Sequence, residues 1–176
     1  MATEKKSAAT KSSRGARAGS NEATALLKRD HAEVKKLFKD YDKLAEREAE
    51  AGERQALAEQ ICTMLTVHAT IEEEIFYPAA RAAGVAADVL DEAEVEHASA
   101  KDLIAQIRDM DAGDALYDAK VKVLGEYVDH HVEEEEGEMF PQCRQSEMDL
   151  AALGAELAAR KAELMSEMSE GMEVVG

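Results

Sequence analysis

Apolar residues recur three and four positions apart along most of the chain from residue 21 onward, which is the spacing of one face of an α-helix. Four long segments carry this pattern, and short breaks separate them. They cover about residues 21–52, 53–84, 88–113 and 114–141. Because amphipathic segments joined by short breaks bury their apolar faces against one another, the pattern predicts an all-α, up-down-up-down four-helix bundle.

The two ends of the chain differ from this middle part. Residues 1–20 hold five of the 21 basic residues and one of the 38 acidic ones, with only small apolar side chains after the first methionine, so we expect a disordered basic tail. Residues 147–168 show a further helical pattern, which predicts a peripheral helix with a frayed end after it. The expected division is therefore a tail (1–20), a bundle (21–146) and a C-terminal helix with its end (147–176).

The composition agrees with a helical fold and narrows the class of protein. The aromatic fraction is 4%, and the 176 residues include only 10 glycines and 2 prolines, so an all-β fold is excluded. The formal net charge is -17, and an acidic surface repels phosphate, so we expect no nucleic acid as a partner of the folded body. No apolar run reaches the roughly 18 residues that a membrane crossing needs, so we expect no membrane partner and a cytoplasmic location. The two cysteines are expected to be ordinary thiols.

Five histidines carry the chemical signal, and four of them lie in an internal repeat. The segment DHAEVKKL at residues 30–37 recurs as EHASAKDL at residues 96–103. The segment from His68 recurs from His131, and in both segments a glutamate follows the histidine by four residues and a proline follows it by ten. Each half of the chain is therefore expected to be a helical hairpin that offers one histidine from its first helix and a histidine with a glutamate from its second.

Side chains four residues apart lie on one face of a helix, so the paired hairpins would bring four imidazoles and two carboxylates to one small volume. Burial of such groups is costly unless a cation satisfies them. Six donors exceed the four of a tetrahedral zinc site, whereas two octahedral irons can share two carboxylates, so two divalent ions are favoured over one. The candidate metal ligands are His31, His68, Glu72, His97, His131 and Glu135.

This arrangement resembles the hemerythrin-like (HHE cation-binding) family, a family of non-haem di-iron helical bundles, over about residues 22–145. The resemblance implies that the six residues bind iron and that Glu72 and Glu135 bridge the ions. The implied cofactor is two iron ions, Fe2+ or Fe3+, with an oxo or hydroxo bridge. The implied small ligand is O2, peroxide or nitric oxide.

Two positions depart from the oxygen-carrying members of that family. They have a second histidine one turn beyond the third-helix histidine, where this chain has Lys101, and they end with a His-x4-Asp pair, where this chain has His131 and Glu135. A missing imidazole leaves a coordination position for solvent. This favours chemistry with peroxide or nitric oxide, or a response to the iron level, over reversible oxygen carriage. We expect the Lys101 amine to lie in solvent.

Other residues near the repeat receive simpler interpretations. His130 also has a glutamate four residues later, but it is one residue out of register, so we expect it on the surface or behind the ligands. Tyr127 is expected to pack in the core, with a role beside the ligands as the alternative. The acidic runs at residues 72–74 and 133–136 are expected to be mostly solvated, and the aromatic residues before the two prolines are expected to pack, namely Phe76, Tyr77 and Phe140.

The leading functional hypothesis is a non-haem di-iron binding protein that binds or reacts with O2, peroxide or nitric oxide. Two alternatives stay open. One is an enzyme that consumes peroxide or nitric oxide, which steady-state turnover would reveal. The other is an iron- or redox-responsive interaction module without turnover, with the basic tail or residues 147–168 as the contact. The sequence does not determine the oligomeric state.

Overall fold

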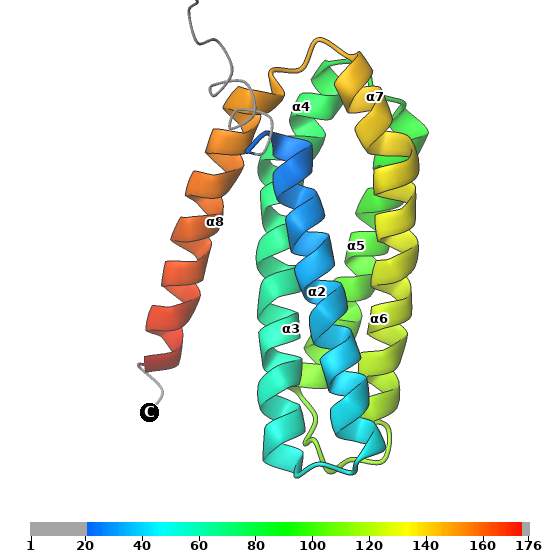
Figure 1. The fold of residues 1–176 in the computed structure, drawn as a ribbon, viewed down its shortest axis with the longest axis vertical. Coiled ribbons are helices and arrows are strands. Elements are labelled where there is room, and N and C mark those ends of the chain that lie inside the picture. The colour runs from blue at the N-terminus through cyan, green and yellow to red at the C-terminus, as the bar shows by residue number, and fades with distance from the viewer. Residues whose placement is uncertain (1–20, 174–176) are drawn as a thin grey trace, which may run out of the picture.

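The computed structural model describes residues 21–173, and every regular element in this range is helical (Figure 1). The expected disorder of residues 1–20 lies outside the described residues. Four antiparallel helices form the bundle: α2 (Ala23–Glu46), α3 (Ala51–Ile71), α5 (Ala87–Arg108) and α6 (Tyr117–Glu134). The up-down-up-down bundle predicted from the apolar spacing is confirmed. None of the described helices is long and apolar enough to cross a membrane.

The helix ends differ from the predicted ones by a few residues. Glu22 rather than Asn21 caps α2, because its carboxylate accepts hydrogen bonds from the backbone N–H groups of the first turn. The chain reverses after α2 at Glu48, whose φ of 52° is left-handed, so Gly52 lies inside α3 instead of in the break. Gly84, with a φ of 82°, ends its helical segment where the sequence predicted an end.

The second helix of each hairpin continues into a π-helical turn that the sequence pattern did not reveal. The turn η1 (Glu72–Phe76) leads into α4 (Tyr77–Ala82), and η2 (Glu135–Met139) leads into α7 (Phe140–Gln145). A proline is the second residue of α4 and of α7, and each proline lacks an N–H and crowds the carbonyl four residues earlier. The helix therefore widens by one residue, and the N–H before each proline bonds to the carbonyl five residues back.

The apolar core divides into two clusters along the bundle, and the histidines lie between them. One cluster lies near α4 and α7 and contains Leu27, Ile71, Phe76, Leu90 and Phe140. The other lies toward the α2–α3 turn and contains Val34, Tyr41, Ile61, Ile104 and Leu124. Both cysteines are free and buried, and burial raises the pKa of each thiol to about 11, so they behave as packing residues.

The C-terminal helix α8 (Leu150–Glu173) lies outside the bundle against α2 and α3, and it continues beyond residue 168, where the pattern predicted its end (Figure 1). Leu157 of α8 is fully buried in the core cluster near α4 and α7. Gly154 lies so close to the start of α2 that a Cβ atom there would be 2.1 Å from the carbonyl oxygen of Asn21. The peripheral helix is therefore anchored by its first turns.

Candidate metal centre

All six residues proposed as ligands lie buried at one level of the bundle, with exposed fractions of 8% or less. The first helix of each hairpin supplies one histidine, and the second helix supplies a histidine and the glutamate that opens the π-turn. Their donor atoms form two groups in which every atom lies within 4.8 Å of the others. The first group is His31, His68, Glu72 and Glu135, and the second is Glu72, His97 and His131.

The imidazoles meet through their Nε2 atoms. The Nε2 atoms of His31 and His68 are 3.2 Å apart, and those of His97 and His131 are 3.1 Å apart. Each pair combines the two helices of one hairpin. The internal repeat of the sequence therefore corresponds to two matched imidazole pairs in space.

Each of the two buried carboxylates contacts an imidazole of both hairpins. The Glu72 oxygens lie 2.9 Å from His68 Nε2 and 3.2 Å from His97 Nε2. The Glu135 oxygens lie 3.2 Å from His31 Nε2 and 3.5 Å from His131 Nε2. A carboxylate that spans two imidazole pairs in this way has the geometry of a bridge between two cations.

The other ring nitrogen of each first-helix histidine contacts a carboxylate from the acidic runs. His31 Nδ1 lies 2.9 Å from Glu136, and His97 Nδ1 lies 2.9 Å from Glu73. These two glutamates follow the buried glutamates directly in the sequence. The prediction that the acidic runs are mostly solvated therefore holds only in part, because two members of each run contact an inner histidine.

The second-helix histidines have matching partners on the first helices. His68 Nδ1 lies 3.1 Å from Asp30, and His131 Nδ1 lies 2.6 Å from Glu96. Both acids immediately precede a histidine in the repeat, which was the sequence signal for this contact. A carboxylate can only accept here, so each Nδ1 carries a hydrogen and each Nε2 faces the centre.

The centre favours positive charge strongly. Burial opposes a charged imidazole at His68, but the nearby Glu72 carboxylate and the Asp30 hydrogen bond outweigh it and raise the pKa of His68 to about 10. Burial also opposes ionisation of Glu135, yet the His131 charge holds its pKa well below the usual range. One oxygen of Glu72 and one of Glu135 are buried without a hydrogen bond among the described residues. Cations would satisfy these oxygens and accept the Nε2 lone pairs, so the donor set fits metal ions.

Tyr77 belongs to the centre, although its sequence position predicted a packing role. Its hydroxyl donates to Glu135 at 2.6 Å and lies 3.2 Å from both Glu72 and His97 Nε2. In a straight α-helix, a residue five positions after Glu72 would point about 140° away from it, and the π-turn reduces this angle to about 40°. Burial and the Glu135 charge raise the pKa of Tyr77 well above its usual value.

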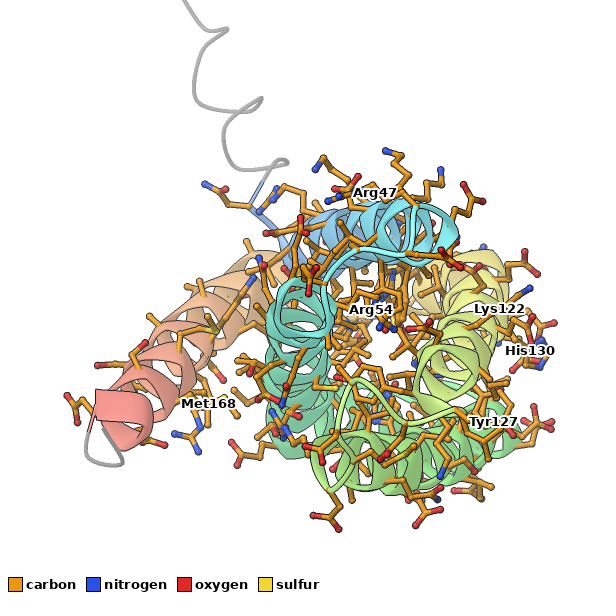
Figure 2. All side chains as sticks on the ribbon, turned by 90° about the horizontal axis from the view of Figure 1, so that it is seen from below. Arg47, Arg54, Lys122, Tyr127, His130 and Met168 are labelled. Carbon is orange, nitrogen blue, oxygen red and sulfur yellow. The ribbon has the colours of Figure 1, made fainter. Side chains whose placement is uncertain are left out.

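The remaining expectations have mixed outcomes. His130 is 63% exposed, which agrees with its expected surface position. Tyr127 is 48% exposed on the outer side of α6, so the core-packing prediction is wrong (Figure 2). Lys101 does not simply extend into solvent, because its amine bonds to both oxygens of Glu73 at 2.6 and 2.7 Å. It therefore acts behind His97 through that carboxylate.

A cavity of about 50 Å³ borders the imidazoles on the side of the core cluster that lies toward the α2–α3 turn. Lys101 and Tyr127, both about half-exposed, contribute to its wall. Its apolar lining consists of Val34, Met64, Leu65, Ala69, Ala100, Ile104, Val128 and Val132. The centre thus adjoins a small and mainly apolar space.

Comparisons with known proteins agree with this geometry. The hemerythrin HHE cation binding domain matches residues 22–143. Uncharacterized proteins of Mycobacterium bovis (Mb2666c) and Mycobacterium tuberculosis (Rv2633c) are each 28% identical over 138 residues, which is 77% of this chain and 82% of the relative. The crystal structure of an HHE cation binding domain-containing protein from Mycobacterium kansasii, a homolog of Rv2633c, has a TM-score of 0.72 at 25% identity and covers 86% of this chain and 92% of that one. The chain therefore belongs to the hemerythrin HHE cation-binding family.

Proposed function

We propose that the chain holds two iron ions in this centre and binds or reacts with a small ligand there. The ligands are the four inner imidazoles with Glu72 and Glu135 as bridges, and Tyr77 lies beside the second imidazole pair. The observation that carries the proposal is the convergence of four Nε2 atoms on two buried carboxylates, each of which has an oxygen without a hydrogen bond.

The charge of the surroundings supports two divalent ions. Two ammonium groups offset part of the negative charge, because Lys161 pairs with Asp30 and Lys101 pairs with Glu73. Six carboxylates with two lysines leave four negative charges, which is the charge that two divalent cations neutralise. The carboxylates are Asp30, Glu72, Glu73, Glu96, Glu135 and Glu136.

The donor types favour iron over zinc. Structural zinc sites are closed tetrahedra of four ligands, mostly thiolate and imidazole. Both cysteines of this chain lie outside the groups of donor atoms. Imidazole with bridging carboxylate suits ions that accept five or six ligands and change oxidation state, as iron does.

The adjoining cavity supports a small ligand. A volume of about 50 Å³ holds a molecule of two heavy atoms, since one water needs about 10 to 15 Å³ by the same measure. Its apolar lining favours uncharged diatomic molecules such as O2 and nitric oxide over peroxide, which needs hydrogen-bond partners. When bound, the two iron ions would supply one or two electrons to such a ligand. The chain supplies the mainly apolar space, the fixed imidazoles and the Tyr77 hydroxyl, which donates a hydrogen bond to Glu135.

Metal analysis of the purified protein tests the proposal. We expect about two irons per chain after anaerobic reconstitution, and in air an absorption band in the near ultraviolet from charge transfer to iron. A double variant, His68→Ala with His131→Ala, is expected to lose both. A stoichiometry of zero or one iron in the parent protein, or two irons in the double variant, would contradict the proposal.

One observation favours a second candidate, a metal-responsive interaction module. Lys161 of α8 contacts Asp30, which in turn contacts His68, so the peripheral helix is linked to the centre by two polar contacts. If α8 responds to metal, protease cleavage within α8 is expected to be faster in metal-free protein than in iron-loaded protein. Steady-state consumption of nitric oxide or peroxide without a change in cleavage would favour an enzyme instead.

A further inference from the structure

The outer carboxylates behind the two second-helix histidines have different surroundings. In the first hairpin, Asp30 receives a cation from the protein itself, because Lys161 Nζ lies 2.5 Å from its Oδ1 while its Oδ2 faces His68. This cation arrives on α8, which covers the α2 and α3 side of the bundle. The carboxylate behind a metal-facing imidazole thus carries a positive partner on its outer side.

The corresponding face of the second hairpin has no helix over it among the described residues. Val95 is 68% exposed there, and Figure 2 shows His130 and Tyr127 on the outside of α6, on the opposite side of the bundle from α8. Counted from the inner histidine of each second helix, His130 and Glu134 occupy the positions of Val67 and Ile71. Those two first-hairpin residues are apolar and buried, so the repeat does not account for a polar pair here.

Glu96, the counterpart of Asp30, faces this polar pair. His130 Nε2 lies 3.2 Å from a Glu134 oxygen and 3.5 Å from Glu96 Oε1. The other Glu96 oxygen lies 2.6 Å from His131 Nδ1. The three donor atoms of Glu96, His130 and Glu134 lie within 4.8 Å of one another.

Neighbouring charges make this place attractive to cations. Asp91 and Glu92 line the same open hollow, and Arg81 already pairs with Asp91 at 2.9 Å, so Glu92 is the neighbour that adds negative charge. The ion pairs of Glu96 and Glu134 within residues 21–173 involve histidines only. The first hairpin shows that a cation binds on the outer side of the equivalent carboxylate. In the second hairpin the chain supplies an imidazole and an extra carboxylate at that point, which are ligands for a cation and not a cation themselves.

We propose that Glu96, His130 and Glu134 form an exchangeable site for a divalent transition-metal cation, distinct from the buried centre. One imidazole nitrogen with carboxylate oxygens suits Zn2+, Fe2+ and Mn2+, and solvent completes the coordination at this open position. The bound cation takes the place that the Lys161 ammonium has in the first hairpin. Glu96 then joins it to His131, one carboxylate away from the buried ligands.

The test is a titration of iron-loaded protein with Zn2+ against a competing chelator, with iron retention followed by absorbance. We expect the parent to bind one Zn2+ more than the His130→Ala variant, and Glu134→Gln to weaken this binding by about tenfold or more. Glu133→Gln removes an equal charge from an exposed neighbour outside the cluster, so it is the matched control and is expected to bind as the parent does.

Equal Zn2+ binding by the parent and His130→Ala would overturn the proposal, as would equal weakening by Glu134→Gln and Glu133→Gln. The outcome does not depend on the buried irons. If the chain fails to take up iron, the same titration of the metal-free parent and His130→Ala is expected to differ by one Zn2+. A missing surface site and a missing iron centre are therefore separate results.

Discussion

The two hairpins agree at the centre of the bundle and differ outside it. Toward the centre, each offers two imidazoles, a buried carboxylate and an aromatic residue before a proline, at matching positions of the repeat. Toward the outside, the first hairpin is covered by α8 with Lys161 on Asp30, whereas the second presents Glu96 and His130 at the surface. The difference teaches that the shared inner centre requires the same residues from both halves, while the outer partners of the same histidines are free to diverge.

Even the inner faces differ at one position. The residue before the first proline is Tyr77, and the residue before the second is Phe140. The Phe140 ring stacks on His31 at 5.9 Å, and the Tyr77 ring lies 5.4 Å from His97, so each ring covers a histidine of the other hairpin. The packing role is shared, and only Tyr77 adds an oxygen to one imidazole pair.

Removal of an inner histidine from either half is expected to have the largest effect. Because the imidazole pairs are equivalent, His68→Ala and His131→Ala should each lower the iron content from about two per chain to one or fewer. The expected loss of metal affinity is well above the 10- to 100-fold that is typical when a residue hydrogen-bonded to a ligand is removed. Iron analysis after dialysis measures this. Retention of both irons by one variant and loss of both by the other would break the equivalence of the halves.

The next largest effect is expected where α8 is anchored to the first hairpin. Gly154→Ala places a Cβ atom against the Asn21 carbonyl and should destabilise the protein by about 1 to 3 kcal/mol, as overpacking does. Gly171→Ala on the same helix is the control, because nothing lies within 4 Å of its Cβ position. Thermal unfolding compares them, and equal melting temperatures would show that the close approach does not hold α8.

Tyr77→Phe makes the inner faces of the two halves alike. We expect it to retain two irons, to cost about 1 kcal/mol of stability from the lost hydrogen bonds, and to change the iron absorption spectrum. Tyr41→Phe is the matched control, because the buried Tyr41 hydroxyl also donates to a carboxylate, Asp118, at 2.6 Å but lies outside the centre. Its spectrum is expected to equal that of the parent. An unchanged spectrum in Tyr77→Phe would exclude the hydroxyl from the centre.

The smallest expected effect concerns the lysine that only the first half has. Lys161→Met removes the cation from Asp30 and should lower the free energy of unfolding by less than about 1 kcal/mol, because the ammonium is partly exposed. It should nevertheless shift the reduction potential of the iron pair, because Asp30 contacts His68. Arg160→Met removes the pair between α8 and Glu74, which is not bonded to a ligand, and Lys161→Arg keeps the charge. Equal potentials in all three variants would limit α8 to a packing role.

The sequence predicted the bundle and the six inner residues because both depend on spacing alone. Apolar periodicity sets which faces meet, and the repeated His-x3-Glu pattern places donors on one face of a helix. The four outer carboxylates were not assigned, although Asp30 and Glu96 stood in the repeat. Acidic residues are so frequent in this chain, 38 of 176, that a particular one conveys little until its distance to an imidazole is known.

Two further features could not be derived from periodicity. Tyr77 faces the centre only because a proline-induced π-turn shifts the helical register, and a calculation at 100° per residue places it on another face. Tyr127 was expected in the core because it lies one helical turn before the inner His131. In the structure α8 covers one hairpin only, and this choice depends on long-range packing of Leu157 and Gly154.

The π-turns also restrict how the chain can change in length. Each contains one residue more than the α-helical turn it replaces, between a fixed glutamate and a fixed proline. A one-residue deletion within residues 72–77 that returned the segment to α-helical winding would keep the ring about 40° from Glu72, whereas a one-residue insertion there would rotate the ring by about 100°. Insertions should therefore be far less tolerated in this window and in residues 135–140 than in the turns that connect the helices, whereas deletion of the one extra residue should keep the ring on the same side.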